Sequence, residues 1–303
     1  SHTCTKFKLR DMEDTLAIGL AVIVVVISAV LWRVFGGKPA LTRAYTRFPV
    51  IEKRIVSDNP ERPVMFITFG VSTATLPTGQ HVKVRMTIDG EVVERPYTPA
   101  RFEPPECELL LRVYPHGKMS RYLYGLQVGD TVEMKGPVGH LRYGDDGPGS
   151  FMRGQRRKFE GVTHIAMIAG GTGITPMLQL VNHCLQDEHD ATALRLVEAN
   201  SCVDDIMMHD ELRTLATGSA GQLELLFTVS KLTAKERRAA RNAHLVEQSL
   251  RNVAEYAKIL RAAFADCPLG DDKTMICLCG PPGFVKAAKA IVVGIGYEQV
   301  LVW

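Results

Sequence analysis

The feature that most constrains the fold is a change in the spacing of apolar residues near Val162. From 44 to 145, short runs of alternating apolar residues are separated by Gly, Pro or Asp, which is typical of antiparallel strands in a small barrel or sandwich. These runs are FPVIEKRIV, VMFITFGV, HVKVRMTI, GEVVERPYT, CELLLRVY and DTVEMKGPV. From 162 to 303, strand-like and helical runs alternate, which predicts parallel strands with crossover helices. We therefore expect a two-domain α/β protein.

Two segments interrupt this plan. Residues 146–161 are rich in glycine and basic side chains, a composition that predicts a mobile surface linker between the domains. Residues 232–266, inside the second domain, have the pattern of a long, charged helical insertion. The sequence assigns no role to this insertion.

The N-terminal segment, 1–36, contains an apolar run from Thr15 to Trp32 with no charged residue across eighteen positions. As a helix this run would be about 27 Å long, close to the roughly 30 Å of a bilayer core. A secretory signal peptide usually has a shorter apolar region, so we interpret the run as a membrane anchor helix. Basic residues dominate downstream, which predicts that the large C-terminal part lies in the cytosol. The endoplasmic reticulum and the mitochondrial outer membrane both fit.

Charge and cysteine content exclude several classes of protein. A net charge of +3 argues against nucleic acid as a partner. The seven cysteines are scattered, and no pair has zinc-finger spacing, so we expect neither a metal site nor a disulfide framework. A reducing compartment is the default inference.

The stretch RPYTPA, 95–100, ends a strand-like run. Arg95 offers a planar fork of donors suited to phosphate, Tyr97 a flat ring, and Thr98 one small donor and acceptor. Alternation along a strand lets Arg95 and Tyr97 share one face. This predicts a ligand with a phosphate at one end and a flat ring at the other. The alternative is a strand that ends in a proline turn.

Two glycine loops follow apolar strands of the second domain. In AGGTGITP, 169–176, the glycines allow a tight turn, Thr175 is placed as a helix N-cap, and Pro176 fits the first helical position. CGPPG, 279–283, again opens a helix. Both loops are expected at the carboxyl ends of parallel strands, where a dinucleotide phosphate would bind. A glycine turn without a ligand is the alternative.

HGKMS, 116–120, precedes a short amphipathic run in the first domain. Ser120 is a reasonable N-cap and Lys118 adds positive charge, which predicts a second anion site at a helix start. By itself the stretch is also compatible with an ordinary cap.

Together, RPYTP, GKMS, GGTGITPM and CGPPG, in this order, resemble the NADH–cytochrome b5 reductases within the ferredoxin–NADP reductase superfamily. The resemblance runs from about Phe48 to the end and includes GQHV, LRVY and GDTVEMKGPVGHL. It implies an FAD-binding antiparallel β-barrel at 44–145 and a Rossmann-like NAD(P)-binding domain at 162–303. It also implies an oxidoreductase that takes hydride from NADH and passes single electrons to cytochrome b5. The anchor is similar to that of membrane-bound members.

The resemblance also implies roles for single residues. Arg95 would meet the FAD pyrophosphate, Tyr97 the ribityl and isoalloxazine region, and Thr98 the neighbourhood of flavin N5. The other FAD-binding residues implied are Pro96, Arg112, Val113, Tyr114, Gly117, Lys118, Met119 and Ser120. The nicotinamide nucleotide would be held by Gly171, Thr172, Gly173, Thr175, Pro176, Ser230, Cys279, Gly280, Pro281 and Pro282. Thr98 and Cys279 are the expected catalytic residues, which would hold nicotinamide C4 over flavin N5.

The acidic surface of cytochrome b5 would suit a basic face on this chain, which we expect to comprise Lys118, Arg121, Arg142, Arg156, Arg157 and Lys158. A quinone or another haem protein is the alternative acceptor, and a catalytically silent, anchored nucleotide-binding adaptor is the alternative function. Where NADH-using relatives have an aspartate after the third parallel strand, this chain has Ser230 followed by Lys231. We therefore expect NADPH to be accepted as well as NADH. Trp303 is a candidate for a terminal aromatic that covers the flavin.

Overall fold

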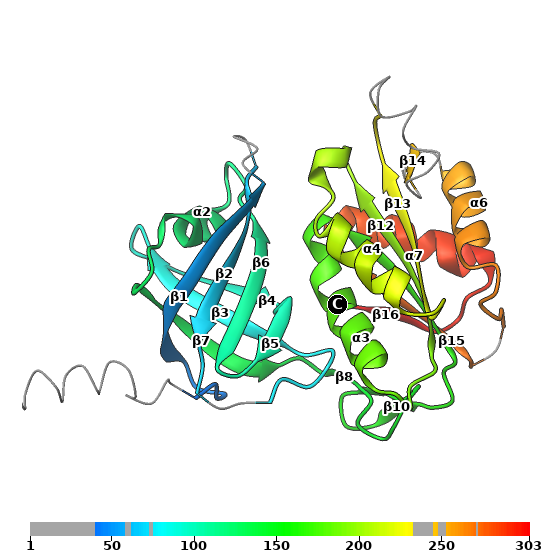
Figure 1. Ribbon diagram of the computed structural model, residues 1–303, viewed down its shortest axis with the longest axis horizontal. Coiled ribbons are helices and arrows are strands. Elements are labelled where there is room, and N and C mark those ends of the chain that lie inside the picture. The colour runs from blue at the N-terminus through cyan, green and yellow to red at the C-terminus, as the bar shows by residue number, and fades with distance from the viewer. Residues whose placement is uncertain (1–39, 58–61, 73–74, 233–244, 248–252, 271) are drawn as a thin grey trace, which may run out of the picture.

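The computed structural model describes residues 40–57, 62–72, 75–232, 245–247, 253–270 and 272–303. Within them the chain forms two domains that lie side by side (Figure 1). The predicted anchor helix, Thr15–Trp32, lies outside the described residues. No helix of the described part is long and apolar enough to cross a membrane.

The first domain is a seven-stranded antiparallel sheet with the order β4-β3-β7-β1-β2-β6-β5. Its strands are β1 Thr46–Ser57, β2 Val64–Gly70, β3 His81–Ile88, β4 Glu91–Tyr97, β5 Arg101–Glu103, β6 Glu106–Arg112 and β7 Thr131–Val138. The sheet curls around a core that contains Phe48, Leu109 and Val132, and helix α2, Lys118–Gly125, adds Leu123 to it. The predicted antiparallel strands are confirmed. Within the described residues the end strands β4 and β5 form no ladder with each other.

The segment 146–161, predicted as a linker, contains regular structure. Strands β8 Leu141–Tyr143, β9 Phe151–Arg153 and β10 Arg157–Phe159 form a small antiparallel sheet. Phe151 is buried and its ring lies 4.7 Å from that of Tyr143. Two buried aromatic rings thus order a segment whose three-residue strands are too short to produce a visible alternation.

The second domain is a six-stranded parallel sheet with the order β14-β13-β12-β11-β15-β16. Its strands are β11 His164–Gly170, β12 Ala193–Asn200, β13 Leu223–Val229, β14 Leu245–Glu247, β15 Thr274–Cys279 and β16 Val300–Val302. Its helices are η1 Gly171–Gly173, α3 Ile174–Gln186, η2 Val203–Asp205, α4 His209–Gly218, α6 Val253–Ala263 and α7 Pro282–Ile295. The predicted parallel sheet with crossover helices is confirmed.

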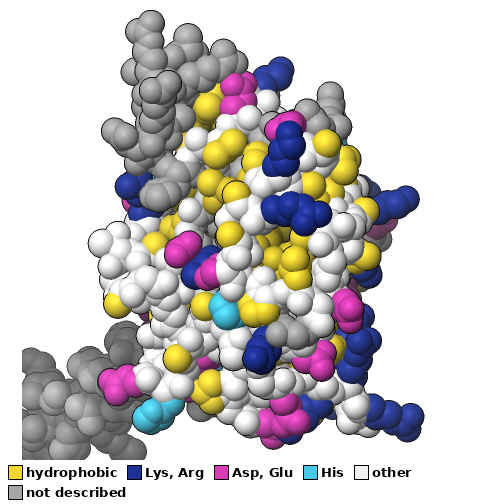
Figure 2. Space-filling view, turned by 90° about the vertical axis from the view of Figure 1, so that its right-hand side faces the viewer, with side chains coloured by type: hydrophobic (Ala, Val, Ile, Leu, Met, Phe, Trp, Pro, Cys, Tyr) yellow, Lys and Arg dark blue, Asp and Glu magenta, His cyan; other side chains and the backbone are white. Residues whose placement is uncertain are grey.

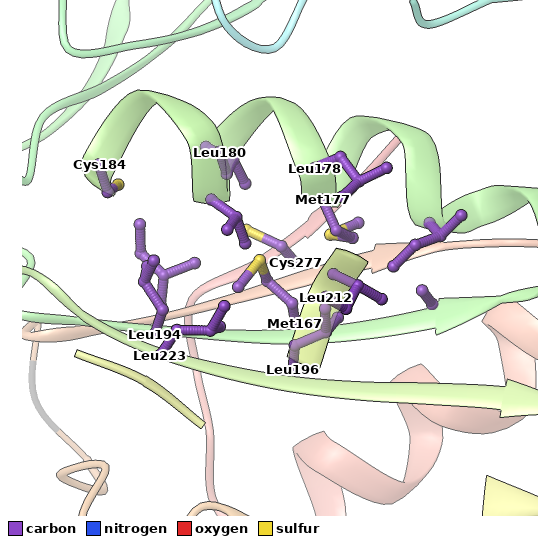
Figure 3. Packing of buried hydrophobic residues seen from close by; sticks show 14 of the residues in the cluster. Met167, Met177, Leu178, Leu180, Cys184, Leu194, Leu196, Leu212, Leu223 and Cys277 are labelled. Carbon is purple, nitrogen blue, oxygen red and sulfur yellow. The ribbon is translucent and has the colours of Figure 1, made fainter. Parts of the chain in front are cut away.

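Helices cover both faces of this sheet because its strands are apolar on both sides. On one face, Met177 of α3 and Leu212 of α4 belong to a core with Met167 and Leu196, as Figure 3 shows. On the other face, α6 and α7 pack against a second core. Because β11, β12 and β15 are parallel, their carboxyl ends lie at the same edge of the sheet. The loops that follow them face the first domain.

The predicted helical insertion at 232–266 is only partly helical in the described residues. Leu245–Glu247 form strand β14, which extends the parallel sheet, and α6 is a crossover helix whose Tyr256 and Leu260 are buried. The prediction is therefore confirmed at α6 and corrected at β14. Most of the charged stretch, 233–244, lies outside the described residues.

The two domains share apolar packing. Val64, Phe66, Ala100 and Leu110 of the first domain belong to the same buried cluster as α3 and β11. Two polar contacts flank it: the amide of Gly79 donates to Gln179 Oε1 at 3.1 Å, and Thr78 Oγ1 lies 3.0 Å from His183 Nδ1. The junction is therefore packed like a domain interior, and the site that lies across it has a defined shape.

Candidate functional site

A cavity of about 960 Å³ lies between the two domains. Its walls include Arg95, Tyr97 and Thr98 from the end of β4 and Thr172, Gly173 and Cys279 from the glycine loops of the second domain. Its size is at the upper end of the range for small-molecule pockets. Motifs that are nearly two hundred residues apart in the chain thus face a single space.

Strand β4 places the RPYT residues along one wall. Arg95 is exposed, and its Nη1 donates to the carbonyl of Glu94 at 2.7 Å, which leaves its other donors available. Burial raises the pKa of Tyr97 to about 12, although the charge of Arg95 opposes the shift, so the phenol stays neutral. The wall therefore combines a cation, a neutral aromatic ring and the hydroxyl of Thr98.

The start of α2 forms the adjacent wall, with a geometry that differs from the prediction. The helix begins at Lys118 after Gly117, and Ser120 is its third residue rather than its N-cap. The Ser120 hydroxyl donates to the carbonyl of Gly117 at 3.1 Å and accepts the amide of Tyr114 at 3.2 Å. A β-carbon on Gly117 would lie 2.4 Å from Ser120 Oγ, so a larger residue there would displace the Ser120 hydroxyl from this turn. No side chain caps the first amides, which stay available for an anion.

The GGTG loop begins its helical winding earlier than predicted. Gly171–Gly173 form the 3-10 turn η1, α3 starts at Ile174, and Thr175 therefore lies inside the first turn. The Thr175 hydroxyl donates to the carbonyl of Thr172 at 3.2 Å rather than capping the helix. Pro176 is the third helical residue, not the first. The expected N-cap is wrong because three glycines permit a turn that the residue types alone did not reveal.

The second glycine loop meets the first at Cys279. Burial raises the pKa of the Cys279 thiol to about 11, against a hydrogen bond that involves Gly280, so the side chain is a neutral thiol. Beside it, the amide of Trp303 donates to the carbonyl of Leu278 at 3.0 Å. Trp303 lines the cavity, and its indole Nε1 is buried without a hydrogen-bond partner.

Some predicted site residues do not line the cavity. Val113, just past the end of β6, packs into the core of the first domain, while its neighbours Arg112 and Tyr114 line the cavity. The others that do not line it are Gly171, Ser230, Pro281 and Pro282. All remaining predicted site residues line it: Pro96, Arg112, Tyr114, Gly117, Lys118, Met119, Ser120, Thr175, Pro176 and Gly280 join those already described.

Sequence reasoning missed a third group of lining residues, which includes Gly79, His81, Gly139, His140, Leu141 and Arg153. Burial lowers the pKa of His81, and the charge of Lys83 adds to the shift, so the imidazole is neutral at neutral pH. These residues lie in three separate parts of the sequence, and the tertiary fold brings them to the cavity. Two available signals were the GQHV stretch, 79–82, and the end of GDTVEMKGPVGHL, 139–141, since both belong to the family resemblance.

Comparisons with known proteins agree with this architecture. Residues 47–143 match the oxidoreductase FAD-binding domain, and residues 167–290 match the oxidoreductase NAD-binding domain. NADH-cytochrome b5 reductase 2 of Mus musculus is 32% identical over 79% of this chain and 86% of its own length. The chain belongs to the NADH-cytochrome b5 reductase family.

Solved structures extend the comparison within and beyond this reductase family. The cytochrome b5 reductase domain of Ulva prolifera nitrate reductase has a TM-score of 0.71 and 30% identity, with 88% of this chain and all of that chain covered. A ferredoxin NADP+ reductase from Neisseria gonorrhoeae shares the fold, with a TM-score of 0.64 at 15% identity over 86% of this chain and 98% of that chain.

The cavity of this reductase fits FAD together with a nicotinamide nucleotide. Arg95, Lys118 and the first amides of α2 offer donors for one pyrophosphate, and the start of α3 offers backbone donors for another. Among its described lining residues no side chain is a carboxylate, and the basic side chains that can meet an anion include Arg95, Arg112, Lys118 and Arg153. Buried donors without partners, Arg112 Nε and Trp303 Nε1, belong to residues that line the same cavity.

The basic face predicted for this reductase is partly neutralised. Lys118 pairs with Glu91, Arg142 with Asp145 at 2.8 Å, and Lys158 with Glu160 at 2.7 Å and Asp146 at 3.3 Å. Arg121 and Arg156 are exposed, and the Arg157 guanidinium lies over the ring of Phe159. On the face of the second domain in Figure 2, positive and negative side chains are interspersed.

Proposed function

We propose that this chain oxidises NADH through bound FAD and passes electrons singly to cytochrome b5. The cavity between the domains carries this conclusion, because the RPYT and GKMS residues face the GGTG and CGPP loops across it. The printed names of its relatives support the acceptor. Bound FAD would supply the exchange between two-electron hydride chemistry and single-electron transfer.

The chain's own residues would bind and orient the two ligands. Arg95, Lys118 and the uncapped start of α2 would hold the FAD pyrophosphate. Tyr97 and Thr98 would set the position of the flavin ring. On the other side, the tight turn at Gly173 would bring backbone donors close to the nucleotide phosphates. The apolar wall at Trp303 would exclude water from the space between the reacting rings.

Cys279 would act by shape rather than by ionisation, since its thiol is neutral. It lies where the two glycine loops touch and would contact the nicotinamide face. Together with Thr98 on the opposite wall, it would fix how far nicotinamide C4 lies from flavin N5.

An enzyme is favoured over a silent adaptor because the flavin motifs line a cavity together with the nucleotide loops. An adaptor would need no such junction. A haem protein with an acidic surface would meet exposed basic side chains such as Arg121, which lies on α2 with the ion-paired Lys118. A quinone acceptor would predict reduction that is insensitive to ionic strength, whereas docking to cytochrome b5 weakens as salt rises.

Use of NADPH is a further part of the proposal. Ser230 is exposed at the carboxyl end of β13, and its amide donates to the carbonyl of Asn200 at 3.1 Å. The exposed Lys231 follows. A serine and a lysine accept a 2′-phosphate that a carboxylate would repel. NADPH activity below about a thousandth of that with NADH would refute dual use, and Ser230→Asp is expected to lower NADPH use selectively.

The anchor at Thr15–Trp32 remains a proposal based on its apolar sequence. It would hold the catalytic domains at the cytosolic face of the endoplasmic reticulum or the mitochondrial outer membrane. Protease treatment of intact organelles tests this orientation. Cleavage of the catalytic domains without detergent supports it, and full protection contradicts it.

The decisive experiment is anaerobic stopped-flow reduction of the FAD-loaded protein with NADH and NADPH in parallel. Rapid loss of flavin absorbance establishes the reductase, and the ratio of the two rates gives the nucleotide preference. If flavin binds and neither nucleotide reduces it, the proposed hydride-transfer site is wrong. If no flavin binds, the assignment of the RPYT wall is wrong.

A further inference from the structure

A buried ion pair joins the two domains beneath the cavity. Arg112 is the last residue of β6 in the first domain, and Asp205 ends the turn η2 in the second. Arg112 Nη2 donates to the Asp205 carbonyl at 2.5 Å and lies 3.5 Å from Asp205 Oδ1. Both side chains are at most 6% exposed, so the pair is out of solvent and little screened by salt.

The same guanidinium also reaches the GGTG loop. A β-carbon placed on Gly171 would lie 3.8 Å from Arg112 Nη1. Arg112 therefore extends from a strand of the FAD domain between two turns of the nucleotide domain, η1 and η2. These turns follow the neighbouring parallel strands β11 and β12. One side chain of the first domain thus contacts the turn η2 of the second and lies close to the turn η1.

A second buried acid shapes the turn that carries Asp205. Glu198 Oε1, on β12, accepts the Asn200 amide group at 2.8 Å and the backbone amide of Met207 at 3.3 Å. These two contacts bracket Asp205 in the chain, and Glu198 is fully buried. Glu198 therefore ties both ends of the turn together and fixes where Asp205 stands.

The rate of hydride transfer depends on how the two domains are placed relative to each other, because each domain would hold one of the two reacting ligands. A displacement of one reacting group by about 1 Å can lower the rate about a hundredfold. Apolar packing at the junction is non-directional, whereas hydrogen bonds and ion pairs across it depend on orientation, and Arg112–Asp205 is the buried ion pair among them. We propose that Arg112 and Asp205 form a positioning pair, held in place by Glu198, that sets the nicotinamide site in register with the flavin site. This inference rests on the proposed function.

Asp205→Asn tests the pair, because Asp205 does not line the cavity and the change keeps its size. The measurement is the limiting rate of flavin reduction at saturating NADH, with FAD content, NADH Kd and thermal unfolding recorded alongside. We expect the limiting rate to fall tenfold or more while FAD content stays the same and the NADH Kd changes less than threefold. Asp204→Asn is the matched control, since Asp204 is the exposed neighbour, and it should match the wild type.

A wild-type limiting rate in Asp205→Asn, with only a lower unfolding temperature, overturns the proposal and makes the pair purely structural. A raised NADH Kd with an unchanged limiting rate also overturns it, because Arg112 would then act on nucleotide binding. If the wild type is not reduced by NADH at all, the proposed function fails instead.

Two variants of Glu198 test the proposed positioning role without changing Asp205. Glu198→Gln retains an oxygen that can accept from Asn200 and Met207, so the limiting rate should stay within threefold of the wild type. Glu198→Ala removes that acceptor and should slow reduction as Asp205→Asn does. Equal rates in the folded Gln and Ala variants contradict the role of Glu198.

Discussion

Gly173 and Cys279 approach so closely that a β-carbon on Gly173 would lie 2.3 Å from the Cys279 carbonyl oxygen. The obstacle is backbone rather than a flexible side chain, so it cannot rotate away. The positions of the two glycine loops of the nucleotide domain therefore depend on each other, and a larger residue at Gly173 would push them apart.

Gly173→Ala should separate the two loops and lower NADH-dependent flavin reduction tenfold or more. FAD content should stay near that of the wild type, because Arg95 and the start of α2 belong to the other domain. Stopped-flow reduction and flavin absorbance measure the two effects. Gly283→Ala is the control, since nothing lies within 4 Å of its β-carbon position. Wild-type reduction by Gly173→Ala would contradict the assigned close approach.

The second prediction concerns Cys279, whose pKa of about 11 leaves about one thiolate in several thousand at pH 7.5. Iodoacetamide should modify it far more slowly than it modifies glutathione, as peptide mass spectrometry can follow. Cys279→Ser should keep hydride transfer within threefold. Rapid alkylation at pH 7.5 would show that the thiol is ionised and is available for chemistry.

Glu198 gives a prediction about stability and pH. Burial raises its pKa from 4.5 to about 7, although Asn200, Met207 and Arg112 act in the opposite direction. Between these values the folded protein keeps a proton that the unfolded chain releases, so its stabilising contribution is full below pH 4.5 and is lost as pH rises through 7. This lost contribution corresponds to about 3 kcal/mol in the free energy of unfolding. Glu198→Gln cannot ionise, and we expect it to be more stable than the wild type at pH 8.5.

Urea unfolding at pH 5 and pH 8.5 measures this difference. Glu211→Gln serves as the control, because Glu211 is exposed on α4. If the gap between wild type and Glu198→Gln is the same at both pH values, the carboxyl is not protonated in the folded state near neutrality.

Trp303 gives the fourth prediction. Its ring lines the cavity and its Nε1 has no partner, while its backbone amide bonds to Leu278 whatever the side chain. Trp303→Ala should change the KM for NADH at least threefold, since part of the wall is removed. Trp303→Phe keeps a ring and should have a smaller effect. Unchanged steady-state kinetics in both variants would assign Trp303 to packing alone.

The sequence predicted the features that have strong local patterns. Alternating runs such as HVKVRMTI became strands, and the glycine loops lie at the carboxyl ends of parallel strands as expected. Helix starts were placed less well, because Gly171–Gly173 wind into a 3-10 turn before α3 begins, and the close approach of Gly173 to Cys279 carries no local sequence signal. The linker sheet escaped notice since its order comes from Phe151 packing on Tyr143.

The sequence motifs predicted the parts of the cavity wall that they form. The remaining parts of the wall were missed, because only the tertiary fold brings their residues to the cavity. His81, Leu141 and Arg153 face it, yet none carries a local signal of binding by itself. Conversely, Val113 stands inside a recognised motif and points into the core. A motif therefore identified the segment, and the tertiary fold decided which of its residues reach the site.

The shared core at the domain junction has a consequence for engineering. Val64, Phe66, Ala100 and Leu110 complete the interior of a domain to which they do not belong in sequence. A chimera that joins this FAD domain to another nucleotide domain would leave these side chains facing a foreign surface. Grafts should therefore transfer the four residues along with the nucleotide domain, and we expect cuts made at the linker alone to yield insoluble hybrids.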